Sequence, residues 1–139
     1  LGRGLEYVIA VEGALKSKEI SYIHSEAFAS GELKHGTIAL ITDGVPVVVN
    51  ATQSDLFEKS VSNIKEVTSR GAYVIAVAKE GNTVVEEVAD EVFYIPNVED
   101  DYAGFPTIVI HQLLAYYLSK LKGNDVDKPR NLAKSVTVE

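Results

Sequence analysis

The chain has 139 residues, no cysteine and no methionine, and its 20 acidic and 13 basic residues give a net charge of −7. This length suits one domain, and the missing cysteines exclude a disulfide framework, a thiolate metal site and a cysteine nucleophile. The acidic excess argues against a nucleic-acid partner. No apolar run reaches the roughly 18 residues of a membrane span. No signal-peptide pattern is present, which favours a cytoplasmic protein.

The N-terminal region is expected to begin with the end of a strand and a turn, over 1–4. Since the chain also lacks an initiator methionine, we interpret it as a fragment of a longer polypeptide. A helix over 6–24, a short strand over 26–29 and a short helix over 32–41, interrupted at Gly36, are expected next. The long helix is favoured by apolar residues at helical spacing: Val8, Val11, Leu15, Tyr22 and Ile23.

The rest of the chain alternates continuous apolar runs with helical patterns. Strands are predicted over 46–50, 72–78 and 91–95, and helices over 54–70, 83–89 and 106–122. Ser54 is the expected N-cap of its helix, and Pro106 suits an early helical position. Strands that are apolar on both faces and alternate with helices indicate a parallel sheet covered on both sides. We therefore expect an α/β fold, a three-layer α/β/α sandwich with four or five strands.

Three charged residues of the first predicted helix share one face, since Glu12, Lys16 and Glu19 follow one another at spacings of four and three residues. One interpretation is a solvated face with a Glu–Lys pair worth about 0.3 kcal/mol. The other is a carboxylate held for proton transfer beside a lysine. The spacing alone leaves both open.

His35 stands beside Gly36, with a second glycine at Gly31, so the backbone there can approach a ligand closely. Histidine suits proton shuttling near neutral pH, although an ordinary surface or capping histidine fits the pattern equally well. His24 and His111 each fall on a predicted helix. No pair of histidines has a metal-ligand spacing with a third group, so no metal site is predicted.

The last segment, 125–139, shows neither a helical nor a sustained strand period and is expected to be an extended tail that follows a domain over 1–124. Lys134 lies between the small residues Ala133 and Ser135, so a substrate carbonyl can approach it. A lysine forms a Schiff base only when neutral, which requires a desolvated pocket or a cationic neighbour. A solvated tail lysine is the alternative.

Three segments, over 12–24, 31–36 and 125–139, together resemble the isomerase domain of the glutamine–fructose-6-phosphate aminotransferases, which consists of sugar isomerase (SIS) subdomains. The resemblance implies that Lys134 forms a Schiff base with C2 of fructose 6-phosphate and that Glu19 moves a proton between C1 and C2. It implies that His35 opens the sugar ring in the neighbouring subunit. Lys16 and Ala133 are then substrate contacts. Ser17 and Thr37 depart from the family pattern, at positions without an assigned role.

The same resemblance implies an enzyme without metal or organic cofactor that makes glucosamine 6-phosphate from fructose 6-phosphate and glutamine. It implies a homodimer, and a glutaminase domain and a first SIS subdomain on the same polypeptide. The Ser/Thr-rich phosphate loop and the cysteine nucleophile of those parts are absent here. Two alternatives stay open: a non-catalytic SIS domain that senses a phosphosugar, and a phosphosugar deglycase.

Overall fold

A computed structural model describes residues 1–132 and shows a parallel sheet of three strands in the order β1-β2-β3. The strands are β1 (Pro46–Ala51), β2 (Tyr73–Lys79) and β3 (Glu91–Ile95). Val48 pairs with Ile75, and Val77 pairs with Phe93. Because all three run in one direction, their carboxyl ends meet at one edge of the sheet.

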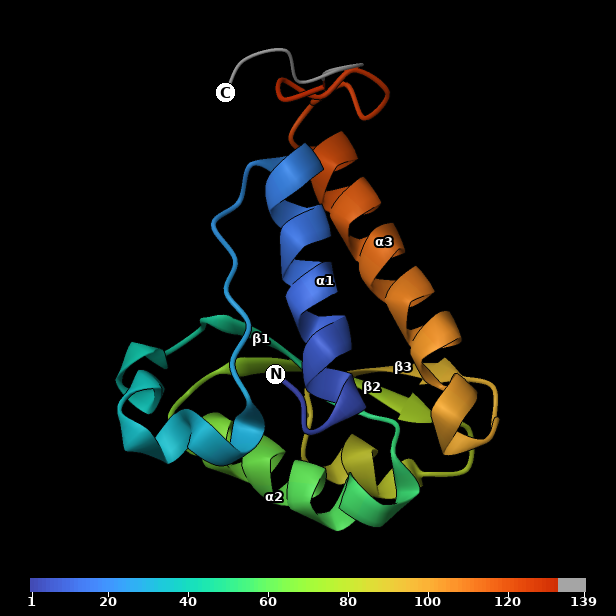
Figure 1. The fold of residues 1–139 in the computed structure, drawn as a ribbon. Coiled ribbons are helices and arrows are strands. Elements are labelled where there is room, and N and C mark those ends of the chain that lie inside the picture. The colour runs from blue at the N-terminus through green and yellow to red at the C-terminus, as the bar shows by residue number, and fades with distance from the viewer. Residues whose placement is uncertain (133–139) are drawn as a thin grey trace, which may run out of the picture.

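Helices cover both faces of this sheet. The three α-helices are α1 (Leu5–Ser21), α2 (Phe57–Thr68) and α3 (Gly104–Leu121). Figure 1 shows α2 below the sheet, and α1 and α3 side by side above it. The main core lies between α2 and the sheet, where Ile64 and Val67 of the helix are fully buried with Val49 and Val74 of the strands. The expected three-layer α/β/α sandwich is confirmed.

The helices α1 and α3 start near the sheet and run in the same direction, so that their C-terminal ends project beyond it (Figure 1). Small residues allow them to pack closely: Ala10 and Gly13 on α1 and Ala115 on α3 are buried. A Cβ atom at Gly13 would collide with the ring of His111. The glycine therefore sets the distance between the two helices.

The strand expected over 26–29 is wrong, because Ala29 makes just an isolated parallel bridge with Gly2. Within residues 1–132 the sheet thus has three strands, not four or five. The expected N-cap role of Ser54 is also wrong. Its hydroxyl donates instead to Asp100 Oδ1 at 2.9 Å, and its amide to Asp100 Oδ2 at 2.8 Å.

Several predicted helices are shorter or tighter than expected. The first ends at Ser21 and not at His24. The short helix expected over 32–41 is two 3₁₀ helices on either side of Gly36, η1 (Ser30–His35) and η2 (Thr37–Leu40). The remaining 3₁₀ helices in the described part of the chain are η3 (Ser54–Leu56), η4 (Thr83–Glu87) and η5 (Asp100–Tyr102).

The apolar stripe of α1 does not face the sheet. Val8, Val11 and Leu15 keep 58%, 44% and 41% of their surface exposed. The helix instead buries Glu6 and Ser21 together with its small residues. Sequence periodicity located the helix correctly, but its apolar face is open to solvent. Among residues 1–132 no helix is long and apolar enough to cross a membrane.

Candidate active site

The candidate site begins with the helix α1, whose start is fixed by two glycines. Gly4 has φ +52, and a Cβ atom at Gly2 would overlap the backbone of Glu6. The chain can therefore turn sharply from Leu1 into the helix. At the other end, Tyr22 ends the helix in the left-handed region, with φ 58 and ψ 25.

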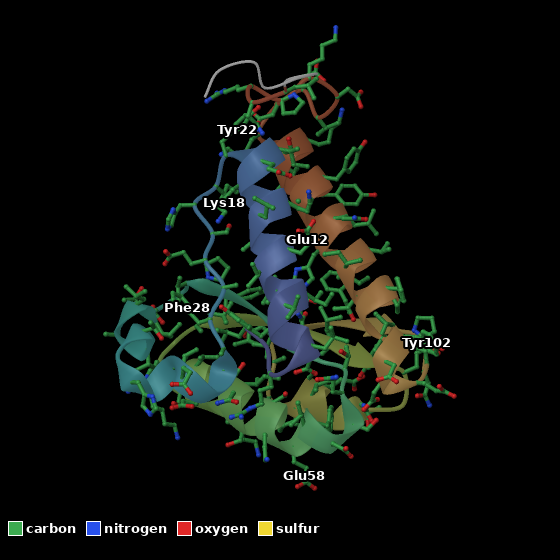
Figure 2. The ribbon with its side chains drawn as sticks, in the orientation of Figure 1. Glu12, Lys18, Tyr22, Phe28, Glu58 and Tyr102 are labelled. Carbon is green, nitrogen blue, oxygen red and sulfur yellow. The ribbon has the colours of Figure 1, made fainter. Side chains whose placement is uncertain are left out.

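Glu12, Lys16 and Glu19 form one connected cluster on α1, as their spacing predicted. The ammonium of Lys16 donates to Glu19 Oε2 at 2.8 Å and lies 3.3 Å from Glu12 Oε1. Each side chain remains partly open to solvent, with 43%, 33% and 35% exposed for Glu12, Lys16 and Glu19. Figure 2 shows Glu12 on the middle turns of α1, away from the sheet. We call these three residues the α1 charge cluster.

The two carboxylates decide the protonation state of Lys16. The hydrogen bond to Glu19 raises the pKa of Lys16 above its ordinary value, and Glu12 adds to the effect. An ammonium with a raised pKa stays charged at neutral pH. Lys16 is therefore suited to hold an anionic ligand and is unsuited to act as the neutral amine that attacks a carbonyl.

His35 lies apart from the α1 charge cluster. It ends η1, and its Nδ1 is 2.8 Å from Glu32 Oε2, with 73% of the side chain exposed. The neighbouring Lys34 lies 3.5 Å from Glu66 on α2, which places η1 beside α2. Figure 1 shows η1 beside α2, on the far side of the molecule from the C-terminal end of α1. The described chain thus does not bring His35 to Lys16 or Glu19.

A groove of about 440 Å³ lies between α1, residues 23–28 and the edge strand β1. It is lined by Ala10, Gly13 and Ser17 of α1, but by none of Lys16, Glu19 and His35. The two acid–base candidates and Lys16 therefore lie outside this groove.

The carboxyl edge of the sheet, where parallel α/β folds usually bind ligands, is filled by the chain's own carboxylates. Glu6 Oε1 accepts hydrogen bonds from the amides of Thr52 at 2.6 Å and Gln53 at 2.9 Å. Asp100 accepts from Ser54 and from the ammonium of the buried Lys79, which lowers the pKa of Asp100. These donors are therefore already occupied by carboxylates of the chain itself.

The root of the C-terminal segment is attached to the end of α1. Ser119 donates to the carbonyl of Ile20 at 2.7 Å, and Lys122 donates to the carbonyl of Ser21 at 2.7 Å. Asn124 also donates to Ile20, at 3.3 Å. These contacts satisfy carbonyls that the end of a helix leaves free.

Two candidate site residues, Ala133 and Lys134, lie outside the described residues. Their roles in substrate contact and Schiff-base formation stay predictions. Within residues 1–132, no three or more histidine or acidic side chains gather in a way that could hold a metal ion.

Comparison with known proteins identifies the family. The family model described as the SIS domain matches residues 1–121. The chain belongs to the SIS domain family. A glutamine–fructose-6-phosphate aminotransferase (isomerizing) from Clostridium acetobutylicum is 63% identical over all 139 residues, which span 23% of that relative. The SIS chain thus spans less than a quarter of the length of this relative.

Solved structures agree with this assignment. The C-terminal domain of glucosamine-fructose-6-phosphate aminotransferase from Francisella tularensis matches with a TM-score of 0.82 and 42% identity, over 91% of this chain and 36% of that one. A glucosamine-6-phosphate deaminase from Thermotoga maritima matches with a TM-score of 0.72 and 31% identity, over 94% and 37% of the two chains. Both are similar to this SIS domain along nearly its whole length.

Sequence reasoning missed the polar groups that organise this SIS domain. Glu6 is the first residue of the helix predicted over 6–24, Lys79 directly follows the strand predicted over 72–78, and Asp100 falls in no predicted element. Their partners are 46, 21 and 46 residues away in sequence. A charged residue directly after a buried strand was the one available signal, and Lys79 fits it.

Proposed function

We propose that this chain is the C-terminal part of the isomerase domain of a glutamine-dependent fructose-6-phosphate aminotransferase. The observation that carries the proposal is the α1 charge cluster, a protonated Lys16 held against Glu19 at the helix end to which the root of the tail is attached. The high identity to the relative from Clostridium acetobutylicum supports the same assignment.

In the proposed reaction, His35 opens the ring of fructose 6-phosphate. The neutral amine of Lys134 then attacks the C2 carbonyl, and water leaves as the imine forms. Ammonia from glutamine then attacks C2 and displaces the amine of Lys134, which leaves an imine that carries the nitrogen of the product. Glu19 takes a proton from C1 of this imine and returns it to C2, which is general acid–base catalysis by a positioned carboxylate and gives glucosamine 6-phosphate. Lys16 holds the substrate electrostatically, and Ala133 leaves room beside Lys134.

The site is proposed to be shared. His35 is remote from Glu19 in one chain, so we infer that it acts in the site of a second subunit in a homodimer. Because the carboxyl edge of the sheet is filled internally, the sugar phosphate is held by a first SIS subdomain of the same polypeptide. A glutaminase domain supplies ammonia, and the whole enzyme is cytoplasmic.

The decisive experiment replaces Lys134 by alanine in the full-length enzyme, meaning the proposed polypeptide that contains this chain. Isomerase turnover of fructose 6-phosphate is expected to be lost, while Lys128→Ala, which removes a nearby exposed lysine, retains it. Unchanged turnover in Lys134→Ala would contradict the role of Lys134. Phosphosugar binding without turnover in the unmodified enzyme would favour a sensor instead.

The isolated chain provides a second test. Residues 1–139 are expected to fold and to associate through the exposed apolar stripe of α1, but not to convert fructose 6-phosphate, because the phosphate site and the second subunit's histidine are both needed. Robust turnover by the isolated chain would overturn the shared site.

A further inference from the structure

Tyr22 holds an unusual backbone conformation for its side chain. It is the one non-glycine residue with positive φ among residues 1–132. Helices often end in this left-handed conformation, but the position normally carries glycine or asparagine because a larger side chain is strained there. A tyrosine is maintained in such a conformation when the surrounding contacts hold it.

The contacts of Tyr22 come from the far end of the chain. The backbone amide of Arg130 donates a hydrogen bond to the Tyr22 hydroxyl at 2.9 Å. The guanidinium of Arg130 lies over the Tyr22 ring, 4.2 Å from its centroid, which is a cation–π contact. Figure 2 shows Tyr22 at the end of α1, beneath the C-terminal segment. The hydroxyl and the ring of Tyr22 thus both contact Arg130.

The segment that leads to Arg130 is folded on itself. Asp125 Oδ1 accepts hydrogen bonds from the amides of Asp127 at 2.9 Å and Lys128 at 3.2 Å. The amide of Leu132 donates to the carbonyl of Pro129 at 3.0 Å. Within 125–132, as far as the structure describes the chain, the hydrogen bond to Tyr22 is the one that joins these turns to the body of the domain.

We propose that Tyr22 is a positioning residue that fixes the root of the tail against α1, so that Lys134 starts from a set point relative to Glu19. The contacts with Tyr22 fix the position of Arg130. Lys134 follows Arg130 by four residues, and because a chain spans at most about 3.6 Å per residue, the Cα atom of Lys134 stays within roughly 14 Å of this fixed point. Glu19 lies on the last turns of the helix that Tyr22 ends. This inference rests on the proposed function of Lys134.

The test uses Tyr22→Gly in the full-length enzyme. Glycine suits the left-handed backbone, so the unfolding temperature is expected to stay the same or to rise. Turnover is expected to fall by about tenfold or more with little change in KM, because a displacement of about 1 Å can cost 10²-fold in rate. Borohydride trapping of fructose 6-phosphate on Lys134, measured by mass spectrometry, is expected to slow in parallel. Tyr22→Phe keeps the ring beneath Arg130 but removes the hydroxyl that accepts from its amide, so its turnover is expected to lie between those of Tyr22→Gly and the unmodified enzyme.

Two further variants distinguish the contact between Tyr22 and Arg130 from other effects of changing residues 125–132. Arg130→Ala removes the cation–π contact but keeps the backbone amide that donates to Tyr22, so it is expected to lower turnover less than Tyr22→Gly does. The double variant is expected to be no worse than Tyr22→Gly alone. Lys128→Ala removes a cation from the same turns and is expected to leave turnover unchanged. If Lys134→Ala abolishes turnover but Tyr22→Gly does not lower it, the positioning role of Tyr22 is wrong and the proposed function stands. If Lys134→Ala retains turnover, the proposed function and this inference both fail.

Discussion

Two glutamates of one helix, Glu6 and Glu19, occupy opposite environments. Glu6 is 2% exposed, and its carboxylate accepts hydrogen bonds from the amides of Arg3, Thr52 and Gln53 and from the hydroxyl of Ser60. Glu19 keeps 35% of its side chain exposed and meets Lys16.

These environments make Glu6 a structural carboxylate and leave the carboxylate of Glu19 accessible to a ligand. Burial raises the pKa of Glu6 although four donors oppose the shift, and a perturbed pKa alone would suggest a functional group. However, donors from the chain itself surround both of its oxygens, so no substrate proton can reach them. Glu19 has free lone pairs, an ammonium beside it and an open approach, which proton transfer requires.

The largest effect in this comparison is expected from Glu19→Gln. Turnover of the full-length enzyme should fall by about 10²- to 10⁴-fold, because the amide cannot carry the proton. The free energy of unfolding in urea should change by less than about 0.5 kcal/mol, since the residue is partly exposed. Parallel kinetic and urea measurements check both parts.

Glu58→Gln on α2 is the matched control, because it makes the same change on an exposed helix residue far from the cluster (Figure 2). Its turnover and stability should equal those of the unmodified enzyme. A Glu19→Gln enzyme with full turnover would remove Glu19 from the mechanism.

Local patterns predicted a large part of this molecule. The continuous apolar runs predicted β1 and β2, because a buried parallel strand is apolar on both faces, and the short apolar run before Pro96 predicted β3. The α1 charge cluster followed from spacing alone, since residues three and four apart on a helix are neighbours. Each of these features depends on residues that are close in sequence.

Contacts between residues that are far apart in the sequence could not be predicted, because local patterns carry no information about them. Asn50 joins the backbone of Glu6 to the ring of His111 across 44 and 61 residues, and Tyr22 meets Arg130 across 108 residues. The false strand over 26–29 and the false N-cap at Ser54 were local patterns that tertiary contacts overrode. The apolar stripe of α1 is a third case, because an apolar helix face usually packs on the core and this one is exposed.

Replacing the structural glutamate is expected to damage the fold and not the chemistry. Glu6→Leu keeps most of the volume but leaves three amides and a hydroxyl without an acceptor, and each buried unsatisfied group costs about 1–3 kcal/mol. The free energy of unfolding should therefore fall by about 3 kcal/mol or more. Urea unfolding of residues 1–139 measures it.

The Glu6→Gln variant tests whether the hydrogen bonds of Glu6 or its negative charge stabilise the fold. The amide retains one acceptor oxygen and removes the cost of a buried charge, so its loss of stability should be well below that of Glu6→Leu. Equal losses in the two variants would show that the negative charge itself, and not the set of hydrogen bonds, stabilises this end of α1.

A smaller, pH-dependent effect is expected from His111, which belongs to the same buried cluster as Glu6. Asn50 donates to the carbonyl of Glu6 through Nδ2, so its Oδ1 accepts from Nε2 of His111 at 2.9 Å and requires the proton there. Burial lowers the pKa of His111 to about 4 from an ordinary 6.5. Between these values the unfolded chain binds more protons than the folded one, so stability is lost as the pH falls.

The slope from this one group is at most about 1.4 kcal/mol per pH unit. Glu6, whose pKa is raised, acts in the opposite sense in an overlapping range, so the total pH dependence does not isolate His111. His111→Gln does, because its amide can still donate to Asn50 and does not titrate, while Glu6 is unchanged. Urea unfolding of both proteins between about pH 4 and 7 should show the difference in stability shifting in favour of the variant as the pH falls. Parallel curves would mean that the folded domain accepts a proton on His111 without cost, and that its burial among α1, α3 and β1 has no electrostatic consequence.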